Sequence, residues 1–278
     1  MPTDAPGAAA TRRLEKVLNM EFPSRVVACS GGIDSLVLAT IAHRSDATGT
    51  VVAHAVTPAV PADCTARVMA YAEREGWDLE VVRPREFEDE RYLSNPTDRC
   101  YYCKTHLYTA LEEISRSSFG PRSATTLSGA NVDDLGDYRP GLLAALEHRV
   151  RHPYVEAGLH KADVRAIARG LGLAEADIPS SPCLASRLYT GTRVRAVTLQ
   201  AVYSGEEILR LLTGVSVARC RVRGKEVLVE VPEADRPLVT ESVLAAVARA
   251  MSAVSPELVA VSLDDRPYRA GRAVLRVS

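Results

Sequence analysis

The chain has 278 residues, of which 25% are charged and 46% hydrophobic, and its net charge is -1. This length predicts one large domain and a smaller one, and the near-neutral charge argues against a global basic field that attracts nucleic acid. No apolar run reaches the ~20 residues that span a bilayer. Residues 1–10 lack the charged start and apolar core of a signal peptide, so we expect a frayed tail and a cytoplasmic protein.

The first part of the chain alternates two kinds of apolar segment. Short apolar runs predict strands at residues 25–29, 50–56, 79–82 and 124–129. Helical periodicity predicts helices at residues 11–20, 36–43, 62–75, 107–115, 140–147 and 160–171. Strands that alternate with helices indicate an α/β fold with a doubly wound parallel sheet, which carries helices on both faces.

The pattern changes after about residue 179, and residues 180–187 have the low periodicity of a loop. Helices are predicted at residues 197–213 and 239–251, and strands at residues 215–222, 226–231 and 258–263. Gly224 and Lys225 predict a hairpin turn between the first two of these strands. This order is typical of a small α+β domain, so we place the domains at residues 1–185 and 186–278.

A glycine turn joins the first predicted strand to the next helix. It consists of Ser30, Gly31, Gly32, Ile33, Asp34 and Ser35. The glycines allow a close approach to an anion, and the N–H groups at a helix start form a positive nest for phosphate. The two serine hydroxyls can add donors, and Asp34 can orient the loop or a bound Mg²⁺. The alternative is an ordinary glycine-rich turn, and the segment lacks the lysine of a Walker A loop.

A second polar loop follows the fourth predicted strand and contains Ser128, Gly129, Asn131, Asp133 and Asp134. Ligands bind at the carboxyl edge of such sheets, so we expect this loop beside the glycine turn. Gly129 and Asn131 are candidate nucleotide-binding residues, and Asp133 and Asp134 are candidate Mg²⁺ ligands. The alternative is a simple turn rich in Asn and Asp.

Six cysteines divide into two groups. Cys29, Cys64 and Cys220 lie in predicted strands or a helix, where cysteine acts as a small buried hydrophobe. Cys100 and Cys103 form a Cys-x-x-Cys pair, and Cys183 lies in the loop after residue 179. Basic residues flank this second group, and positive charge stabilises thiolates; they are Arg99, Lys104 and Arg187.

A reduced Cys-x-x-Cys pair predicts a metal site, a cluster site or a redox pair. The sequence has no second Cys-x-x-Cys that would complete a four-cysteine zinc site. Together with Cys183 the pair supplies three thiolates. A 4Fe–4S cluster held by three cysteines leaves one iron open for a ligand such as sulfide.

The glycine turn resembles the phosphate loop of the PP-loop ATP-pyrophosphatases. This superfamily includes NAD and GMP synthetases, asparagine synthetases, tRNA-thiolating enzymes and tRNA-lysidine synthetases. The resemblance implies that the loop holds the β,γ-pyrophosphate of ATP while a substrate oxygen attacks the α-phosphorus. Preorganised donors and Mg²⁺ would stabilise the pyrophosphate.

Further motifs cover nearly the whole chain in order, and their combination resembles the LarE family. They are Arg99-Cys100-Tyr101-Tyr102-Cys103-Lys104, Gly129-x-Asn131-x-Asp133-Asp134, Arg139-Pro140-Gly141, Lys161-x-x-x-Arg165, Pro182-Cys183-Leu184-Ala185-Ser186-Arg187, Arg219-x-Arg221 and Glu230. The resemblance implies an ATP-dependent sulfur transferase. It would adenylate the carboxylates of pyridinium-3,5-biscarboxylic acid mononucleotide and convert them to thiocarboxylates, for the nickel-pincer nucleotide cofactor of lactate racemase.

The resemblance also implies how sulfur is delivered. In family members that have all three cysteines, a 4Fe–4S cluster presents an extra sulfide, which makes Cys100, Cys103 and Cys183 catalytic cluster ligands here. Members that lack the Cys-x-x-Cys pair give up the sulfur of the cysteine that matches Cys183, which ends as dehydroalanine. The resemblance further implies a homo-oligomer, a hexamer.

Several residues match the family's region for substrate and phosphate. They are Lys104, Ser186, Arg187, Arg219, Arg221 and Glu230. Planar guanidinium groups suit carboxylate and phosphate, although a solvated strand face is the alternative for Arg219 and Arg221. A further family carboxylate matches either Glu206 or Glu207.

The sequence departs from the family after the Arg-x-Arg pair, where Arg223-Gly224-Lys225 stands in a shorter hairpin in place of His-rich residues. Three other classes remain open. A tRNA-thiolating enzyme of the same superfamily would need a basic excess, so we expect no nucleic-acid partner. An amide-forming ligase of the NAD synthetase type needs no cysteines. A non-catalytic nucleotide-binding regulator would not require an intact phosphate loop.

Overall fold

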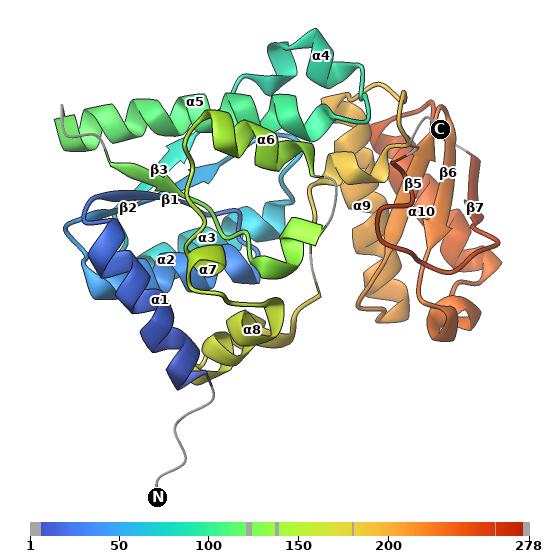
Figure 1. The fold of residues 1–278 in the computed structure, drawn as a ribbon. Coiled ribbons are helices and arrows are strands. Elements are labelled where there is room, and N and C mark those ends of the chain that lie inside the picture. Colours follow the sequence, from blue (N-terminus) through green and yellow to red (C-terminus); the bar gives the residue numbers. More distant parts are fainter. Residues whose placement is uncertain (1–6, 121–123, 137–138, 180, 259, 275–278) are drawn as a thin grey trace, which may run out of the picture. The chain divides into compact units, whose positions relative to one another are not determined.

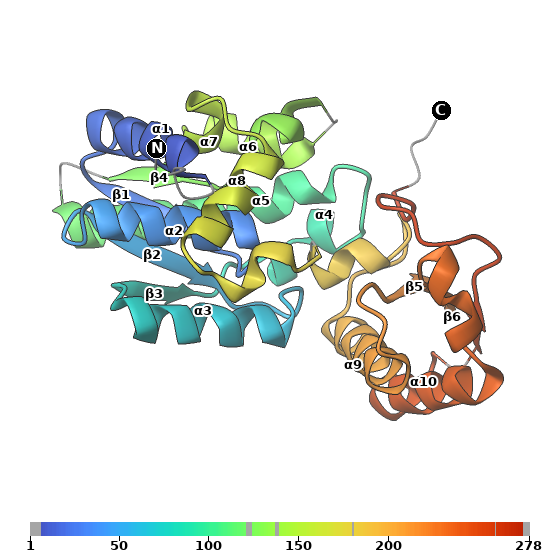
Figure 2. The same ribbon diagram turned by 90° about the horizontal axis from the view of Figure 1, so that it is seen from below.

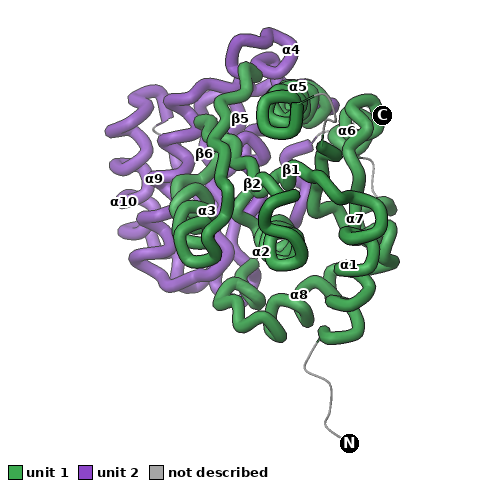
Figure 3. The backbone as a smooth tube through the Cα atoms, turned by 90° about the vertical axis from the view of Figure 1, so that its left-hand side faces the viewer, with its two compact units in different colours: residues 1–86, 100–180 green, residues 87–99, 181–278 purple. Residues whose placement is uncertain are grey.

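The computed structural model describes residues 7–120, 124–136, 139–179, 181–258 and 260–274. The chain divides into two compact units, residues 1–86 with 100–180 and residues 87–99 with 181–278 (Figure 3). Residues 1–6 of the expected tail lie outside the described residues. The first helix, α1 (Ala8–Glu21), begins three residues earlier than the sequence predicts.

A four-stranded parallel sheet forms the centre of the first unit (Figure 1). Its strand order is β3 (Leu79–Val82), β2 (Thr50–Ala55), β1 (Arg25–Ala28) and β4 (Thr125–Leu127). In the central register, Val27 pairs with Val52 on one side and Leu127 on the other. The parallel sheet confirms the predicted α/β class. It follows from the apolar runs, since a strand buried on both faces reads as nearly continuous hydrophobic sequence.

Helices cover both faces of this sheet (Figure 2). On one face pack α1, α2 (Ile33–Ser45), α3 (Ala62–Glu75) and α8 (Lys161–Gly170), and on the other α5 (Arg99–Phe119) and α6 (Pro140–Glu147). Neighbouring strand residues point to opposite faces. Val27 therefore joins Leu36 and Val68 in one core cluster, while Val26 joins Leu111 in the other.

Helix α5 is much longer than the predicted helix at residues 107–115. Periodicity marked only the part in which Tyr108, Leu111 and Ile114 are buried against the sheet. The helix starts at Arg99, so the Cys-x-x-Cys pair lies in its first two turns and not in a loop. The four-residue helix α7 (Pro153–Glu156) has no counterpart in the prediction, because so short a helix shows no periodicity.

The second unit holds a mixed three-stranded sheet in the order β5 (Arg219–Arg223), β6 (Glu226–Glu230) and β7 (Ala260–Leu263). Strands β5 and β6 form the predicted antiparallel hairpin, with Gly224 at a φ of +60° in its two-residue turn. Strand β7 runs parallel to β6. Helices α9 (Ala196–Thr213) and α10 (Glu241–Val254) pack together on this sheet.

Segment 87–99, which includes α4 (Glu90–Leu93), is tied to the second unit by buried polar contacts. The Asn95 side-chain amide donates to the carbonyls of Tyr189 and Thr192, each at 2.9 Å. Arg99 donates to the carbonyl of Ala185 at 2.9 Å.

None of the helices in the described part of the chain combines the length and the apolar character that a membrane-spanning helix needs.

Candidate active site

The glycine turn of the first unit connects β1 to α2 in a conformation that only glycine adopts without strain. Gly31 has a φ of +80°, and a Cβ atom there would lie 2.5 Å from the carbonyl oxygen of Cys64. The Ser35 hydroxyl accepts from the Ser30 N–H at 3.0 Å and donates to the Gly32 carbonyl at 2.9 Å. Gly32 caps α2 without a side chain, so the turn leaves the positive helix start open to an anion.

Asp34 is held from two other segments of the first unit. The Tyr154 hydroxyl donates to its backbone carbonyl at 2.7 Å, and the Lys161 ammonium group contacts its Oδ2 atom. Its Oδ1 atom is buried and has no hydrogen-bond partner among the described residues. A buried carboxylate oxygen without a partner suits a bound cation such as Mg²⁺.

The second polar loop packs against the glycine turn, as the sequence predicts for the carboxyl edge of the sheet. A Cβ atom on Gly129 would lie 3.1 Å from the Asp34 carbonyl carbon and 3.1 Å from the Ser35 nitrogen. Ser128 Oγ lies 2.8 Å from His152 Nδ1, and burial lowers the pKa of His152. Because of the short distances from a Cβ atom at Gly129, only a residue without a side chain lets the two loops pack this closely.

Asn131, Asp133 and Asp134 hold this second loop together. Asn131 is buried, and its Oδ1 atom accepts from the Asp133 N–H at 3.0 Å. Asp133 pairs with His160 Nδ1 at 2.8 Å and accepts from the Lys161 N–H at 2.8 Å, and these contacts lower its pKa. Asp134 accepts from the Asn131 N–H at 3.0 Å.

These contacts orient α8, since Asp133 caps its first turn and so presents Lys161 to Asp34. Asp134 also pairs with Arg139 at 2.9 Å, at the start of α6. A role for Asp133 or Asp134 as a Mg²⁺ ligand stays a prediction. Among the three aspartates, Asp34 is the one whose buried oxygen lacks a partner within the described part of the chain.

Cys100 is exposed in the first turn of α5, and Cys103 is half-buried one turn further along the helix. Lys104 follows them, with its ammonium group 5.7 Å from the Tyr108 ring centre. Close to this turn, a Cβ atom on Gly141 would lie 3.1 Å from Lys104 Cγ, so α6 approaches α5 closely at its start. Both thiols are accessible from solvent, as a cluster or a redox partner requires.

Cys183 lies in the second unit, half-buried just before a short 3₁₀ helix, Leu184–Arg187. Arg187 shapes its loop. The guanidinium group donates to the carbonyls of Pro182 at 2.6 Å and Cys183 at 3.2 Å, and to Ser186 Oγ at 3.2 Å. Arg187 thus acts on the backbone around Cys183. Within neither unit do the described residues bring three or more His, Cys, Asp or Glu side chains together as a preformed metal site.

The opposite edge of Arg187 forms a buried bidentate pair with Glu206 of α9, with both N–O distances 2.8 Å. Burial opposes the charge of Arg187, but the hydrogen bonds to Glu206 outweigh it and raise the pKa of Arg187. Glu206 also accepts from the Cys220 N–H at 3.1 Å, while Glu207 is exposed and contacts Arg210. Of the two glutamates that the sequence left open, Glu206 is therefore the one joined to the cysteine loop.

Arg219 and Arg221 lie buried on β5, so the alternative of a solvated strand face is wrong. Arg221 pairs with Glu230 of β6 at 2.9 Å and donates to the Ser186 carbonyl at 2.9 Å. Burial, with a smaller effect of nearby Arg187, lowers the pKa of Arg219. Charged groups enclosed in this way keep their geometry, because few side-chain rotamers remain open to them.

Arg272 is a member of this network that the sequence did not indicate. Its Nη1 atom donates to Glu230 at 2.9 Å, so this carboxylate joins two arginines. It lies outside every motif, 42 positions from its partner. No local signal in the sequence pairs residues at that separation.

The chain is similar to proteins of several organisms. It is 32% identical over 230 residues to the pyridinium-3,5-bisthiocarboxylic acid mononucleotide synthase of Lactiplantibacillus plantarum, which is a LarE protein, and the match covers 81% of each chain. The chain belongs to the LarE family. It is 34% identical over 212 residues to an uncharacterised protein of Synechocystis, covering 76% of this chain and 78% of the other. No protein-family model matches the chain.

A more distant relative is an uncharacterised protein of Methanocaldococcus jannaschii, 27% identical over 202 residues, or 71% of this chain and 75% of that one.

In this LarE chain, the three remaining cysteines behave as core residues. Cys29, Cys64 and Cys220 are buried. Burial raises the pKa of Cys29 to about 11 and also raises the pKa of Cys220. These thiols are poor nucleophiles and poor ligands.

Proposed function

We propose that this LarE protein is an ATP-dependent sulfur transferase that converts the carboxylates of pyridinium-3,5-biscarboxylic acid mononucleotide to thiocarboxylates, for nickel-pincer nucleotide cofactor biosynthesis. The observation that carries the proposal is the phosphate loop with its Lys161–Asp34 pair, in a chain whose relative is named as the synthase of the bisthiocarboxylic product. A cation and an open helix start suit the pyrophosphate of ATP.

In the first half of the reaction, a substrate carboxylate oxygen attacks the α-phosphorus of ATP. The bond to the β-phosphate oxygen breaks, and pyrophosphate leaves with the electron pair. The backbone N–H groups from Gly32 onward and the Lys161 ammonium group would stabilise the charge on the pyrophosphate. Asp34, through Oδ1, would hold Mg²⁺, which neutralises the same oxygens.

In the second half, a sulfur nucleophile attacks the carbonyl carbon of the acyl adenylate, and AMP leaves as the thiocarboxylate forms. Arg219 and Arg221 would bind the second carboxylate or the phosphate of the mononucleotide. Arg187 would keep the backbone around Cys183 in one conformation, because it holds the carbonyls of Pro182 and Cys183.

We propose that Cys100, Cys103 and Cys183, the three thiols outside the core, are the ligands of a 4Fe–4S cluster, as the family resemblance implies. Cys100 and Cys103 are one helical turn apart and accessible, and Cys183 is only half-buried on its loop. When bound, such a cluster supplies a sulfide on the iron that no cysteine holds. We further propose Mg²⁺ as cofactor, the cytoplasm as location, no nucleic-acid partner and a homo-hexamer as assembly.

The test is product analysis with the full chain, prepared anaerobically. The protein is incubated with ATP, Mg²⁺, sulfide and the biscarboxylic mononucleotide, and the products are identified by mass spectrometry. We expect AMP, pyrophosphate and a thiocarboxylate, with no product when ATP is omitted.

Two parallel reactions separate the other enzyme classes. One replaces sulfide by ammonia, and the other replaces the mononucleotide by tRNA. An amide or a thiolated tRNA in place of the thiocarboxylate would overturn the proposal. Cys183→Ala should abolish thiocarboxylate formation, while an amide ligase would be unaffected by this change.

A further inference from the structure

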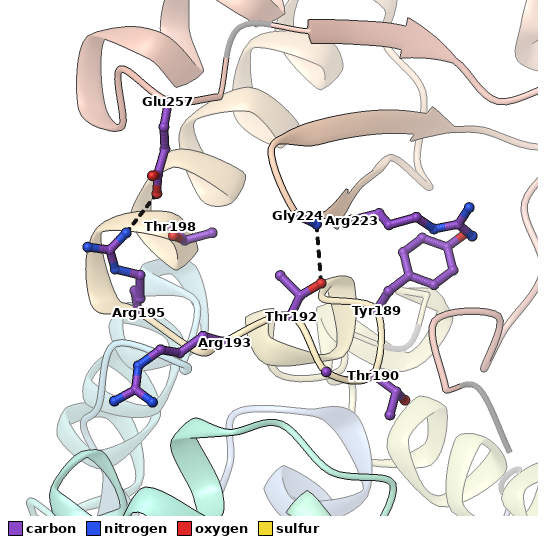
Figure 4. Close-up of a pocket in the computed structure, with 10 residues that line it drawn as sticks. Tyr189, Thr190, Thr192, Arg193, Arg195, Thr198, Arg223, Gly224 and Glu257 are labelled. Atoms are coloured by element: carbon purple, nitrogen blue, oxygen red, sulfur yellow. Dashed lines mark hydrogen bonds and ion pairs between the residues drawn. The ribbon is translucent and has the colours of Figure 1, made fainter. Parts of the chain in front are cut away.

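The second unit contains a cavity of about 520 Å³ that the proposed reaction does not use (Figure 4). Its wall comes from the loop of residues 189–195, the first turn of α9, the hairpin turn at Gly224, and Glu257. Neither Cys183 nor Arg187 lines it. This volume lies within the range of pockets that bind small organic ligands, roughly 300–1,000 Å³.

Positive charge dominates this wall, since it carries three arginines and one carboxylate. Arg195 pairs with Glu257 at 2.9 Å (Figure 4). Arg193 pairs with Glu90, which is not part of the wall. The arginine side chains of both pairs are more than half exposed, at 55% and 52%. Exposed pairs of this kind are weak, so a stronger anion can take over the guanidinium groups.

Arg223 differs from the other two arginines. Within the described part of the chain it has no carboxylate partner, and its guanidinium carbon lies 4.2 Å from the centre of the Tyr189 ring (Figure 4). Stacking on an aromatic ring orients a guanidinium group without using its N–H donors. The Tyr189 hydroxyl is itself buried and lacks a hydrogen-bond partner among the described residues.

The start of α9 adds a second source of positive potential. The helix has 18 residues, and its N-cap residue, Arg195, makes no side-chain capping hydrogen bond. Both Arg195 and Thr198 of the first turn line the cavity. The partial positive charge of a helix start therefore acts on the same space as the arginines.

The wall is also braced against collapse. The Gly224 N–H donates to the Thr192 hydroxyl at 3.3 Å and so joins the hairpin turn to the loop of residues 189–195 (Figure 4). Asn95 holds the same loop from segment 87–99 through the carbonyls of Tyr189 and Thr192. The cavity is thus a preformed site.

We propose that this cavity binds the phosphate group of a small phosphate monoester of nucleotide size. A phosphate dianion suits the side of the cavity that holds Arg193, Arg195 and the helix start, because guanidinium groups and helix starts both bind phosphate. Arg223, stacked on Tyr189, lies on the other side, where the rest of the nucleotide would bind (Figure 4). The site belongs to the second unit alone, and it is distinct from the phosphate loop of the first unit.

The test is calorimetric titration of the full chain with AMP. In Arg195→Gln/Arg223→Gln we expect one AMP-binding event to disappear or weaken by at least about 10-fold, because the variant loses one cation from each side of the cavity. The matched control is Arg169→Gln, which removes an exposed arginine of α8 and should keep every event. Thermal unfolding of both variants checks that they fold like the parent.

Three results would overturn the proposal. The first is an unchanged AMP titration in the double variant. The second is adenosine binding to the cavity as tightly as AMP, which would exclude phosphate recognition. The third is an RNA oligonucleotide whose binding the double variant loses while AMP binding stays, which would make this surface macromolecular. None of these measurements depends on sulfur transfer, so the cavity and the proposed function are tested independently of each other.

Discussion

Asp34 is the residue at which three segments of the first unit meet. Its backbone accepts from Tyr154, one carboxylate oxygen faces Lys161, and the other is buried without a partner among the described residues. In the proposed ATP site, the pair with Lys161 would keep the carboxylate from repelling the phosphates. It leaves one oxygen for a cation.

Replacing Lys161 by Ala removes the positive charge of its ammonium group and leaves the negative charge of Asp34 uncompensated beside the phosphate loop. We expect the rate of ATP-dependent pyrophosphate release to fall by roughly 10²–10³-fold, which is the usual effect of removing one preorganised donor that stabilises charge in the transition state. Lys161→Arg should retain more activity, and Lys16→Ala, an exposed lysine of α1, should behave like the parent. An unchanged rate in Lys161→Ala would exclude a role in catalysis.

Glu206 and Glu207 are neighbours with opposite environments. Glu206 and its partner Arg187 are 0% and 1% exposed, whereas Glu207 is 48% exposed. Removing one member of a buried pair leaves an uncompensated charge, so Glu206→Gln should lower the free energy of unfolding by about 3–5 kcal/mol. Glu207→Gln should cost less than about 1 kcal/mol. Denaturant titration of both variants measures the difference, and equal losses would contradict it.

The thiols should separate by reactivity in reduced, metal-free protein. With a pKa of about 11, Cys29 is deprotonated in roughly one molecule in a thousand at pH 8, and the fraction grows only as the pH approaches that value. Iodoacetamide at pH 8 should therefore label Cys100 first and leave Cys29 and Cys220 unlabelled until denaturant is added. Peptide mass spectrometry reads the order, and early labelling of Cys29 would refute its burial.

At the scale of elements, the unit β1–turn–α2 carries the proposed phosphate site, and the geometry of this turn depends on the two glycines in different ways. Gly31 has a positive φ and closely approaches the Cys64 carbonyl. Gly32 has a φ of -81°, and a Cβ atom added there would have Ser30 Oγ as its nearest neighbour, at 3.6 Å. Only the first position excludes a side chain by backbone strain and by contact.

Gly31→Ala should thus destabilise the first unit by about 1–3 kcal/mol from backbone strain, with a further loss from the contact with Cys64. Gly32→Ala should leave the unfolding free energy within about 0.5 kcal/mol of the parent. Thermal or denaturant unfolding distinguishes them. Equal stability of the two variants would mean that the turn has another conformation.

Helix α5 is the element in which sequence reasoning failed most clearly. Its first two turns, from Arg99, expose Cys100 and lack the apolar stripe that periodicity detects. Tertiary contacts at the start and in the centre of the helix make the difference. Arg99 is fixed by the Ala185 carbonyl within the second unit, and Tyr108 and Leu111 bury the centre against the sheet.

At the scale of the whole molecule, the candidate cluster ligands come from both units, two from the first and one from the second. If they share one cluster, loss of a single thiol from either unit should have the same effect. Anaerobically reconstituted protein should be brown and hold about four iron atoms per chain, and Cys100→Ala and Cys183→Ala should both lose them. Cys64→Ala, a buried thiol of α3, should keep its iron.

Iron and labile-sulfide analysis measures this prediction. A colourless parent protein without iron after strict anaerobic reconstitution would refute the cluster. Mass spectrometry of Cys183 after turnover would then test the sacrificial route, in which this residue becomes dehydroalanine.

The sequence by itself determined the parallel sheet, the place of the phosphate loop in it and the hairpin of the second unit. These features depend on neighbours in the chain: apolar runs, a strand–glycine–helix order and a two-residue turn. It also pointed to the site motifs, since their residues are contiguous or a few positions apart.

Only the tertiary structure decided how these residues are paired and buried. It paired Asp34 with Lys161 across 127 positions, chose Glu206 over Glu207 by burial, and added Arg272 to Glu230. It also formed the basic cavity from segments that share no motif. The physical reason is that burial and pairing depend on which distant segments pack together. Local propensity does not encode that choice.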